Sequence, residues 1–437
     1  MSAVTAQRGR SPFRFRAFSL LLGGQALSSI GDQFYAVALP IALLAHPHLR
    51  TGGPTVLGTL LAGYGAARAL TLLLGGWAAD WAGSRLVMLA SDILRAVAVA
   101  WLAALLDSPR PALTGLVAAV VILGIGDGFF SPASFAIMPS LVPSGDLQRA
   151  NSVYMAAGQA ISAIGPLLGG VLVSALDPSV ALAADSISFL VSTASLMLIG
   201  LYRRSHPQPH AARASPDEQR SLDGERIGLW ALWRTSPLLR ALLLAAAAAS
   251  AVFGGITEVA VPTLATRTLH AGADGYGIML AGLSAGTFAG ALASAKIGKT
   301  RTGPSAVSCI SLAGLAVALL ALTPLLPGEP ALALATTLLA LTGGGLGAGN
   351  SLLMTVFQLR LPERILGRAM SLMLLANFGL YPVSTLLSGL LVPRLGVTAT
   401  LIGAGLFLSA TALATLTSRS VRVVSLLHPS TESASTA

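Results

Sequence analysis

Two acidic residues lie inside long apolar segments of this 437-residue chain, where a carboxyl group can take up and release a proton. Asp32 stands between Gly31 and Gln33, and no basic residue lies one helical turn away from it. A charge at the centre of a bilayer costs at least about 2.5–3.5 kcal/mol, so it needs a partner or a purpose. Burial without a partner favours the neutral carboxyl. We therefore expect Asp32 to be a proton-coupling carboxyl, which binds and releases a proton as the protein acts. Asp127 is the second candidate.

The other charges inside apolar segments can also serve as structural partners of one another. Two acids and two bases at one depth would neutralise each other around a central cavity, and Asp92 lies one turn from Arg95 on the same helix face. The second half offers Glu258, nearer the end of its segment. We expect intramembrane ion pairs to involve Arg68, Asp92, Arg95 and Glu258.

The residues needed for covalent or metal chemistry are missing. Cys309 is the only cysteine, so neither an intramolecular disulfide nor a thiol metal cluster can form. The six histidines show no HExxH-like spacing, and the chain lacks both a GxxxxGK[ST] loop and a GxSxG elbow in a plausible context. The sequence therefore predicts neither an enzyme nor a metal site, and no cofactor.

The elements that must position these carboxyls are membrane helices. Hydrophobic residues make up 54% of the chain and charged residues 10%, against about 25% charged in soluble domains. Apolar segments of about 20 residues are long enough to cross a bilayer as helices. We predict an all-α membrane protein with twelve such helices, at about 18–44, 56–78, 86–106, 112–138, 151–175, 179–201, 238–264, 276–295, 304–325, 331–357, 368–391 and 397–416.

The distribution of basic residues predicts the orientation. With the N-terminus inside, 21 of the 27 Lys and Arg residues fall in inner segments, four in outer loops and two within helices. This bias places both termini in the cytoplasm. It also accounts for the net charge of +10 without nucleic acid, because basic loops meet anionic lipid. Arg outnumbers Lys 25 to 2, which hints at a GC-rich bacterial genome. We expect the chain to lie in the bacterial cytoplasmic membrane.

The chain repeats itself at a spacing of 219 residues. Gly58 recurs as Gly277 and Gly170 as Gly389, and the same register holds at many further positions. Two like halves are the layout of a transporter built around a central path. We predict two pseudo-symmetric six-helix bundles, at 1–202 and 237–418, joined by a polar cytoplasmic linker at 203–236 and followed by a tail at 419–437.

One loop carries a family signature. Residues 76–85 read GWAADWAGSR, which resembles the GxxxDRxGRR/K loop of the major facilitator superfamily at Gly76, Asp80, Gly83 and Arg85. Trp81 and Ser84 stand where that family has basic residues. The glycines permit a tight turn, and Asp80 can pair with Arg85 or with a helix N-terminus. The resemblance implies an inner gate at this loop.

Further motifs point to export. Residues 165–170 resemble the GPxxGG motif of the antiporter branch through Gly165, Pro166, Gly169 and Gly170, a packing face that seals the outer side. The segments 132–152, 92–96 and 362–368 resemble drug, macrolide and enterobactin exporters. The resemblance implies a proton-coupled efflux antiporter that acts as a monomer on a small amphiphilic substrate.

The substrate pocket is expected to be apolar with few polar groups. Its candidate residues are Tyr35, Gln159, Phe253, Asn350 and Asn377. An uptake symporter or uniporter of the same fold remains an alternative, although the Trp, Asn and Gln residues typical of a sugar path are sparse. A membrane scaffold or sensor is a further alternative, but it would need neither unpaired carboxyls nor matched halves.

Overall fold

The protein is helical throughout the part of the chain that the structure describes. The computed structural model describes residues 12–49, 52–205, 237–297, 302–360, 376, 379–417 and 422. The predicted linker at 203–236 and tail at 419–437 fall almost entirely outside these ranges. So does the first part of the predicted helix at 368–391.

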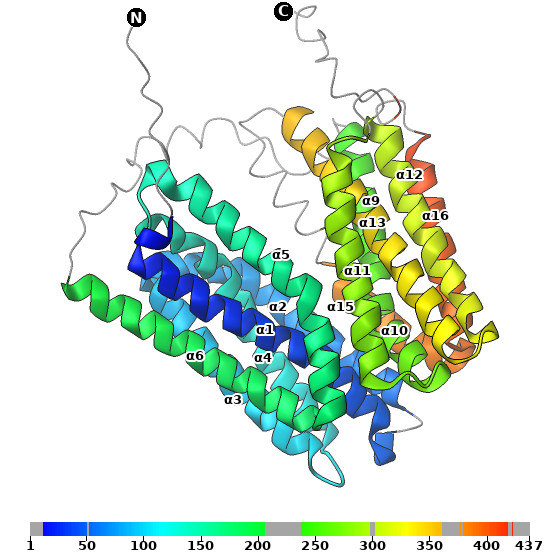
Figure 1. The fold of residues 1–437 in the computed structure, drawn as a ribbon, viewed down its shortest axis with the longest axis horizontal. Helices are drawn as coiled ribbons and strands as arrows, with labels where there is room; N and C mark the ends of the chain where they lie inside the picture. Colours follow the sequence, from blue (N-terminus) through cyan, green and yellow to red (C-terminus); the bar gives the residue numbers. More distant parts are fainter. Residues whose placement is uncertain are drawn as a thin grey trace, which may run out of the picture.

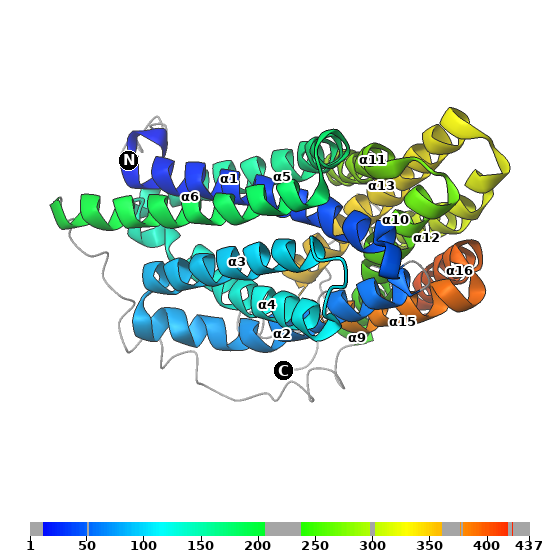
Figure 2. The same cartoon turned by 90° about the horizontal axis from the view of Figure 1, so that it is seen from below.

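The first half consists of six long helices and three short 3-10 turns. The helices are α1 (Arg16–Ala45), α2 (Gly53–Ala82), α3 (Ser84–Leu106), α4 (Leu113–Ala136), α5 (Ser144–Ala175) and α6 (Pro178–Ser205), and the turns are η1 (Pro12–Arg14), η2 (Pro47–Leu49) and η3 (Met138–Ser140). Helices α1, α5 and α6 lie in one layer, and α2, α3 and α4 in a second (Figure 2). The pairs α3–α6 and α1–α2 join the two layers.

The second half is built in the same way but its helices are more interrupted. Its elements are α9 (Pro237–Gly255), η4 (Ile256–Ala260), α10 (Val261–Thr263), η5 (Leu264–Thr268), α11 (Gly272–Ser294), α12 (Thr302–Leu319), η6 (Leu320–Leu325), α13 (Gly328–Arg360), α15 (Tyr381–Leu395) and α16 (Val397–Thr415). Figure 1 shows this half as a separate bundle beside the first.

Ten of the described helices are long and apolar enough to cross a membrane, and α2 is an eleventh if its two parts form one bent span. Several helices extend past the apolar segments seen in the sequence. For example, α2 reaches Ala82 and α13 reaches Arg360. Their polar ends can remain helical outside the hydrocarbon because a helix satisfies its own backbone hydrogen bonds. The all-α membrane fold is thus confirmed, and the number twelve stays a prediction.

The repeat-related glycines form the two crossings between the halves. On α2, a Cβ atom added to Gly58 would lie 2.7 Å from the Cα of Gly389 on α15. On α5, a Cβ added to Gly170 would lie 3.1 Å from the Cα of Gly277 on α11. Only residues without a side chain allow two helix backbones to approach this closely. The 219-residue shift converts one crossing into the other.

Three hydrogen bonds join the halves near these crossings. Thr55 donates to the carbonyl of Gly389 at 2.9 Å, and Ser174 donates to Asp274. Arg267 donates to the carbonyl of Leu44 at 3.2 Å. All of these residues belong to the end of the molecule where α1 ends and α2 begins, which we call the closed end. At the opposite end the two bundles diverge (Figure 1).

Candidate functional site

The charged cluster in the first half is organised by Arg95, whose side chain is 3% exposed. Arg95 forms an ion pair with Asp92 on its own helix α3, and its Nη1 donates to Asp127 on α4 at 2.9 Å. The guanidinium lies over the rings of Phe130 and Phe189, 4.0 and 4.3 Å from the ring centroids. Such cation–π contacts are strongest where water is excluded. Arg95 is therefore held by two carboxylates and two aromatic rings.

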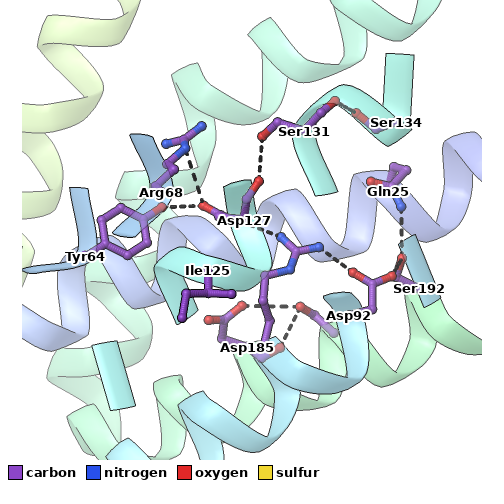
Figure 3. A network of polar contacts seen from close by, with 12 residues as sticks. Gln25, Tyr64, Arg68, Asp92, Ile125, Asp127, Ser131, Ser134, Asp185 and Ser192 are labelled. Carbon is purple, nitrogen blue, oxygen red and sulfur yellow. Dashed lines mark hydrogen bonds and ion pairs between the residues drawn. The ribbon is translucent and has the colours of Figure 1, made fainter. Parts of the chain in front are cut away.

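The same cluster ties four helices together. Asp92 accepts a hydrogen bond from Ser192 on α6 at 2.6 Å, and Gln25 on α1 donates to Ser192 at 2.9 Å. The chain of polar contacts therefore runs from α1 through α6 and α3 to α4 (Figure 3). The Nη atoms of Arg95 and the side chains of Asp92, Ser192 and Gln25 are paired, whereas the Nε of Arg95 has no hydrogen-bond partner within the described residues. The paired groups couple the four helices to one another.

Asp127 has partners on α2 as well. Tyr64 donates to its Oδ2, and the Nε of Arg68 lies 4.0 Å from that same oxygen. Figure 3 shows Tyr64 and Arg68 approaching Asp127 from one side. Two arginines and a tyrosine hydroxyl therefore surround this carboxyl, which remains 20% exposed. Tyr64 was not singled out from the sequence, although it precedes Arg68 by one helical turn.

Asp32 contrasts with Asp127. It lies midway along α1 with an exposed side chain, and within the described ranges no ion pair or hydrogen bond is recorded for it. The charges that act on it belong to Arg95, Asp127, Asp92 and Arg68, which come from the three neighbouring helices α2, α3 and α4. Its carboxyl therefore faces the interior of the bundle, and that interior is open enough to expose it.

Glu258 lies in an irregular part of the second half. It belongs to the π-helical turn η4, four residues before Pro262. Proline has no N–H to donate to the Glu258 carbonyl, and the backbone instead forms a wider turn in which the N–H of Val261 donates to Ile256. No ion pair of Glu258 occurs in the described chain, and its side-chain neighbour is the hydroxyl of Tyr381.

Tyr381 joins the two halves at this depth. A Cβ on Gly65 of α2 would lie 2.9 Å from its ring, and one on Gly254 of α9 would lie 2.7 Å from the same ring. The ring is thus packed between a glycine of the first half and one of the second. Sequence reasoning missed Tyr381 because it lies directly beside a proline at a helix start, where no spacing marks it.

The loop at residues 76–85 has a different geometry from the expected ion pair. Arg85 donates to the carbonyl of Leu196 on α6 at 3.3 Å, whereas Asp80 is exposed and has no ion pair with Arg85. Gly83 has φ +87° and is the single residue between α2 and α3, so glycine is needed there. Around Gly76 the space is open.

The glycines of the GPxxGG motif pack against both halves. Positions 165 and 169 face Gln33 on α1, and Gly170 faces α11 at the closed end. Pro166 lies inside the continuous helix α5, and its carbonyl lies 2.6 Å from where a Cβ on Gly277 would be. The motif therefore lines a helix junction at which side chains would not fit.

The candidate pocket residues are scattered. The Tyr35 hydroxyl is buried without a hydrogen-bond partner in the described chain, and Phe253 packs against the core. Gln159 and Asn350 are exposed, and Asn377 lies outside the described residues. A further carboxyl, Asp185 on α6, is buried beside Gly31 and was not singled out from the sequence. Its position inside a predicted membrane helix was the signal that could have revealed it.

Comparisons with known proteins agree with this architecture. A family model described as Major Facilitator Superfamily matches residues 21–381. The chain is 26% identical over 406 residues to the multidrug efflux pump Tap of Mycolicibacterium fortuitum, covering 91% of this chain and 93% of that protein. It is 28% identical over 364 residues to the enterobactin exporter EntS of Salmonella typhi, covering 78% of this chain and 77% of that protein.

Solved structures with little sequence identity share the fold. A bacterial homologue of the iron transporter ferroportin in the inward-facing state matches with a TM-score of 0.67 at 17% identity, over 92% of this chain and 98% of that one. A D-xylose-proton symporter matches with a TM-score of 0.67 at 15% identity, over 95% of this chain and 100% of that one.

Proposed function

Because the chain belongs to the major facilitator superfamily, we propose that it is a secondary active exporter that exchanges protons for a drug-like or siderophore-like small molecule. Two relatives that match along most of their length, a multidrug efflux pump and an enterobactin exporter, support outward transport of such molecules. The proposal places the protein in the bacterial cytoplasmic membrane, with both termini in the cytoplasm, and lets it act as a monomer.

One observation carries the coupling mechanism, namely the different environments of the carboxyls in the first half. Asp92 and Asp127 share the cations of Arg95 and Arg68. Asp32 faces the interior with its side chain exposed, and no ion pair holds it within the part of the chain that the structure describes. A carboxyl of this kind can bind a proton or a substrate, but a carboxylate held by two arginines binds a proton poorly. Asp32 is therefore the favoured proton carrier and Asp127 the second.

The transport cycle follows from this difference. Proton binding at Asp32 removes a negative charge from the interior and releases the substrate that competes for the same space. The bundle moves as a rigid body because the Arg95 network joins four of its helices. The opening then alternates between the closed end and the opposite end, with glycine crossings acting as the contact points.

The test is export driven by a pH gradient in proteoliposomes. Ethidium serves as the drug-like probe and enterobactin as the siderophore probe. Asp32→Asn should abolish uphill export while downhill movement survives, because Asn is permanently neutral. Asp107→Asn, which removes an exposed carboxyl at the end of α3, is the matched control and should retain export. Uphill export of both probes that persists in Asp32→Asn and in Asp127→Asn would contradict the mechanism.

The same assay separates export from uptake. Accumulation of a probe with the proton gradient, rather than against it, would identify the uptake symporter that is the alternative reading of this fold. Absence of any movement of either probe, with the purified protein correctly folded, would favour the non-transporting scaffold.

A further inference from the structure

Asp185 on α6 is a buried carboxyl that the proposed exchange at Asp32 does not use. It is 1% exposed, and its Oδ2 has no hydrogen-bond partner within the described residues. Ser188 donates to the Asp185 carbonyl at 2.7 Å and reaches Oδ1 only at 3.4 Å. None of the ion pairs in the described chain includes Asp185.

An ionised carboxylate in such a place is costly. Removing a charge from water without a counter-ion costs several kcal/mol even after relaxation of the surroundings. The cation that acts on Asp185 is Arg95, and its guanidinium already forms ion pairs with Asp92 and Asp127. The position of Asp185 therefore suits a carboxyl that binds a proton.

Gly31 brings the backbone of α1 into close contact with the side chain of Asp185. A Cβ on Gly31 would lie 2.5 Å from Asp185 Oδ1 and 2.9 Å from the Cβ of Ser188, so that only glycine fits at this point of α1. Asp32 is the next residue of the chain. Asp185 therefore contacts α1 at the residue that directly precedes Asp32.

The charges around Asp185 support a direct link to Asp32. Among the charged groups that act on Asp185, Asp32 has the largest effect, followed by Arg95 on α3 and Asp127 on α4. The Tyr35 hydroxyl on α1 is a further titratable group on which the charge of Asp185 acts. Two carboxylates that act on each other repel, so that a proton bound at one of them depends on the charge of the other.

We propose that Asp185 is a second proton-binding carboxyl, which exchanges its proton with Asp32 where Asp185 contacts α1 at Gly31, so that the pair loads and releases two protons. In the transfer, the O–H bond of Asp185 breaks, an O–H bond forms on the Asp32 carboxylate, and the negative charge moves to Asp185. Asp32, which faces the interior, exchanges with water. This inference deepens the proposed proton coupling and rests on it.

Infrared difference spectra of the purified full chain in proteoliposomes, recorded across a pH titration, test the pair without any substrate. Protonated carboxyls give resolved C=O bands. Asp185→Asn should remove one band that responds to pH, and Asp32→Asn should alter the pH response of the band that remains. Asp177→Asn, which removes an exposed carboxyl just before α6, should change neither.

Two further variants keep the test decisive. Asp185→Glu should shift the same band rather than remove it, which identifies the group even where the Asn variant does not fold. Gly31→Ala retains both carboxyls but places a methyl group against Asp185 Oδ1, which pushes that carboxyl away from α1, and the Asp185 band should then lose its response to pH.

Three outcomes would overturn the inference. They are no band lost in a folded Asp185→Asn protein, a lost band that never responded to pH, or an unchanged response in Gly31→Ala. Export that does not depend on the pH gradient would instead refute the proposed function. The infrared bands would then still show whether Asp185 binds a proton.

Discussion

Gly58 on α2 and Gly389 on α15 meet backbone to backbone, with the Cα of Gly389 lying 2.7 Å from where a Cβ on Gly58 would be. Their repeat counterparts, Gly277 and Gly170, meet in the same manner between α11 and α5. The same contact between two glycines therefore occurs twice at the closed end. The 219-residue repeat relates the two contacts, because each glycine of one has its counterpart in the other.

Gly58→Val should open the closed end. Overpacking costs about 1–3 kcal/mol, which lowers the population of the closed form about 5- to 150-fold. Spin labels on His48→Cys and Leu325→Cys in a Cys309→Ala background should report a longer distance across the closed end. Gly403→Val, at a position with open space, is the control and should leave the distance unchanged. An unchanged distance in Gly58→Val would show that the crossing does not hold this end closed.

Arg95→Met should be strongly destabilising. Removing the cation leaves the carboxylates of Asp92 and Asp127 without their buried partner, at a cost of about 3–5 kcal/mol. Thermal unfolding in detergent should show this as a large fall in Tm. The double variant with Asp92→Asn should recover part of the loss. If Arg95→Met unfolds at the wild-type temperature, the network does not stabilise the bundle.

Asp80→Asn should lower transport and leave expression and Tm near normal. The side chain is exposed, so that its removal disturbs no packing. We propose that its charge acts in the inner gate, so the loss should fall on transport. Initial export rates per amount of purified protein measure the effect. A collapse of membrane expression would assign Asp80 a structural role instead.

Tyr381→Phe should separate the contribution of the Tyr381 hydroxyl from that of ring packing. The ring between Gly65 and Gly254 remains, and only the hydroxyl beside Glu258 is lost. Substrate affinity and the pH dependence of export should change while Tm does not. Tyr381→Ala should in addition lower the free energy of unfolding, because the half-buried ring would no longer fill the space between the two glycines. If Tyr381→Phe and the wild type bind substrate with equal affinity, the Tyr381 hydroxyl is not part of the binding site.

The orientation of the protein in the membrane can be tested with two single cysteines in a Cys309→Ala background, one beyond each end of α3. Arg110→Cys should react with an impermeant thiol reagent in intact cells, because the excess of basic residues puts its loop outside. Trp81→Cys, which is exposed at the other end, should react only after the cells are opened. The reverse pattern would invert the topology.

The sequence alone determined the fold class, the transporter family and the position of the repeat. The fold class and the repeat follow from local properties, because apolar length and the 219-residue register can be read without knowing which helices touch. The family follows from the resemblance of residues 76–85 and 165–170 to its motifs. The sequence also identified Asp32, Asp92, Arg95 and Asp127 as unusual, since a charge inside a membrane helix is costly wherever the helix packs.

The tertiary structure decided which of these charges meet. Asp127 pairs with Arg95 from α3 and Arg68 from α2, whereas Asp32 is left facing the interior, and no pattern within one helix distinguishes the two. Tyr381 emerged only from packing, because its place depends on Gly65 of another helix, which leaves room for its ring. The position of Asp185 inside a membrane helix can be read from the sequence, but its contact with Gly31 of α1 cannot. Partner choice is a property of the assembled bundle. Helix–helix contacts at long sequence separation fix it, and the spacing along one segment does not contain that information.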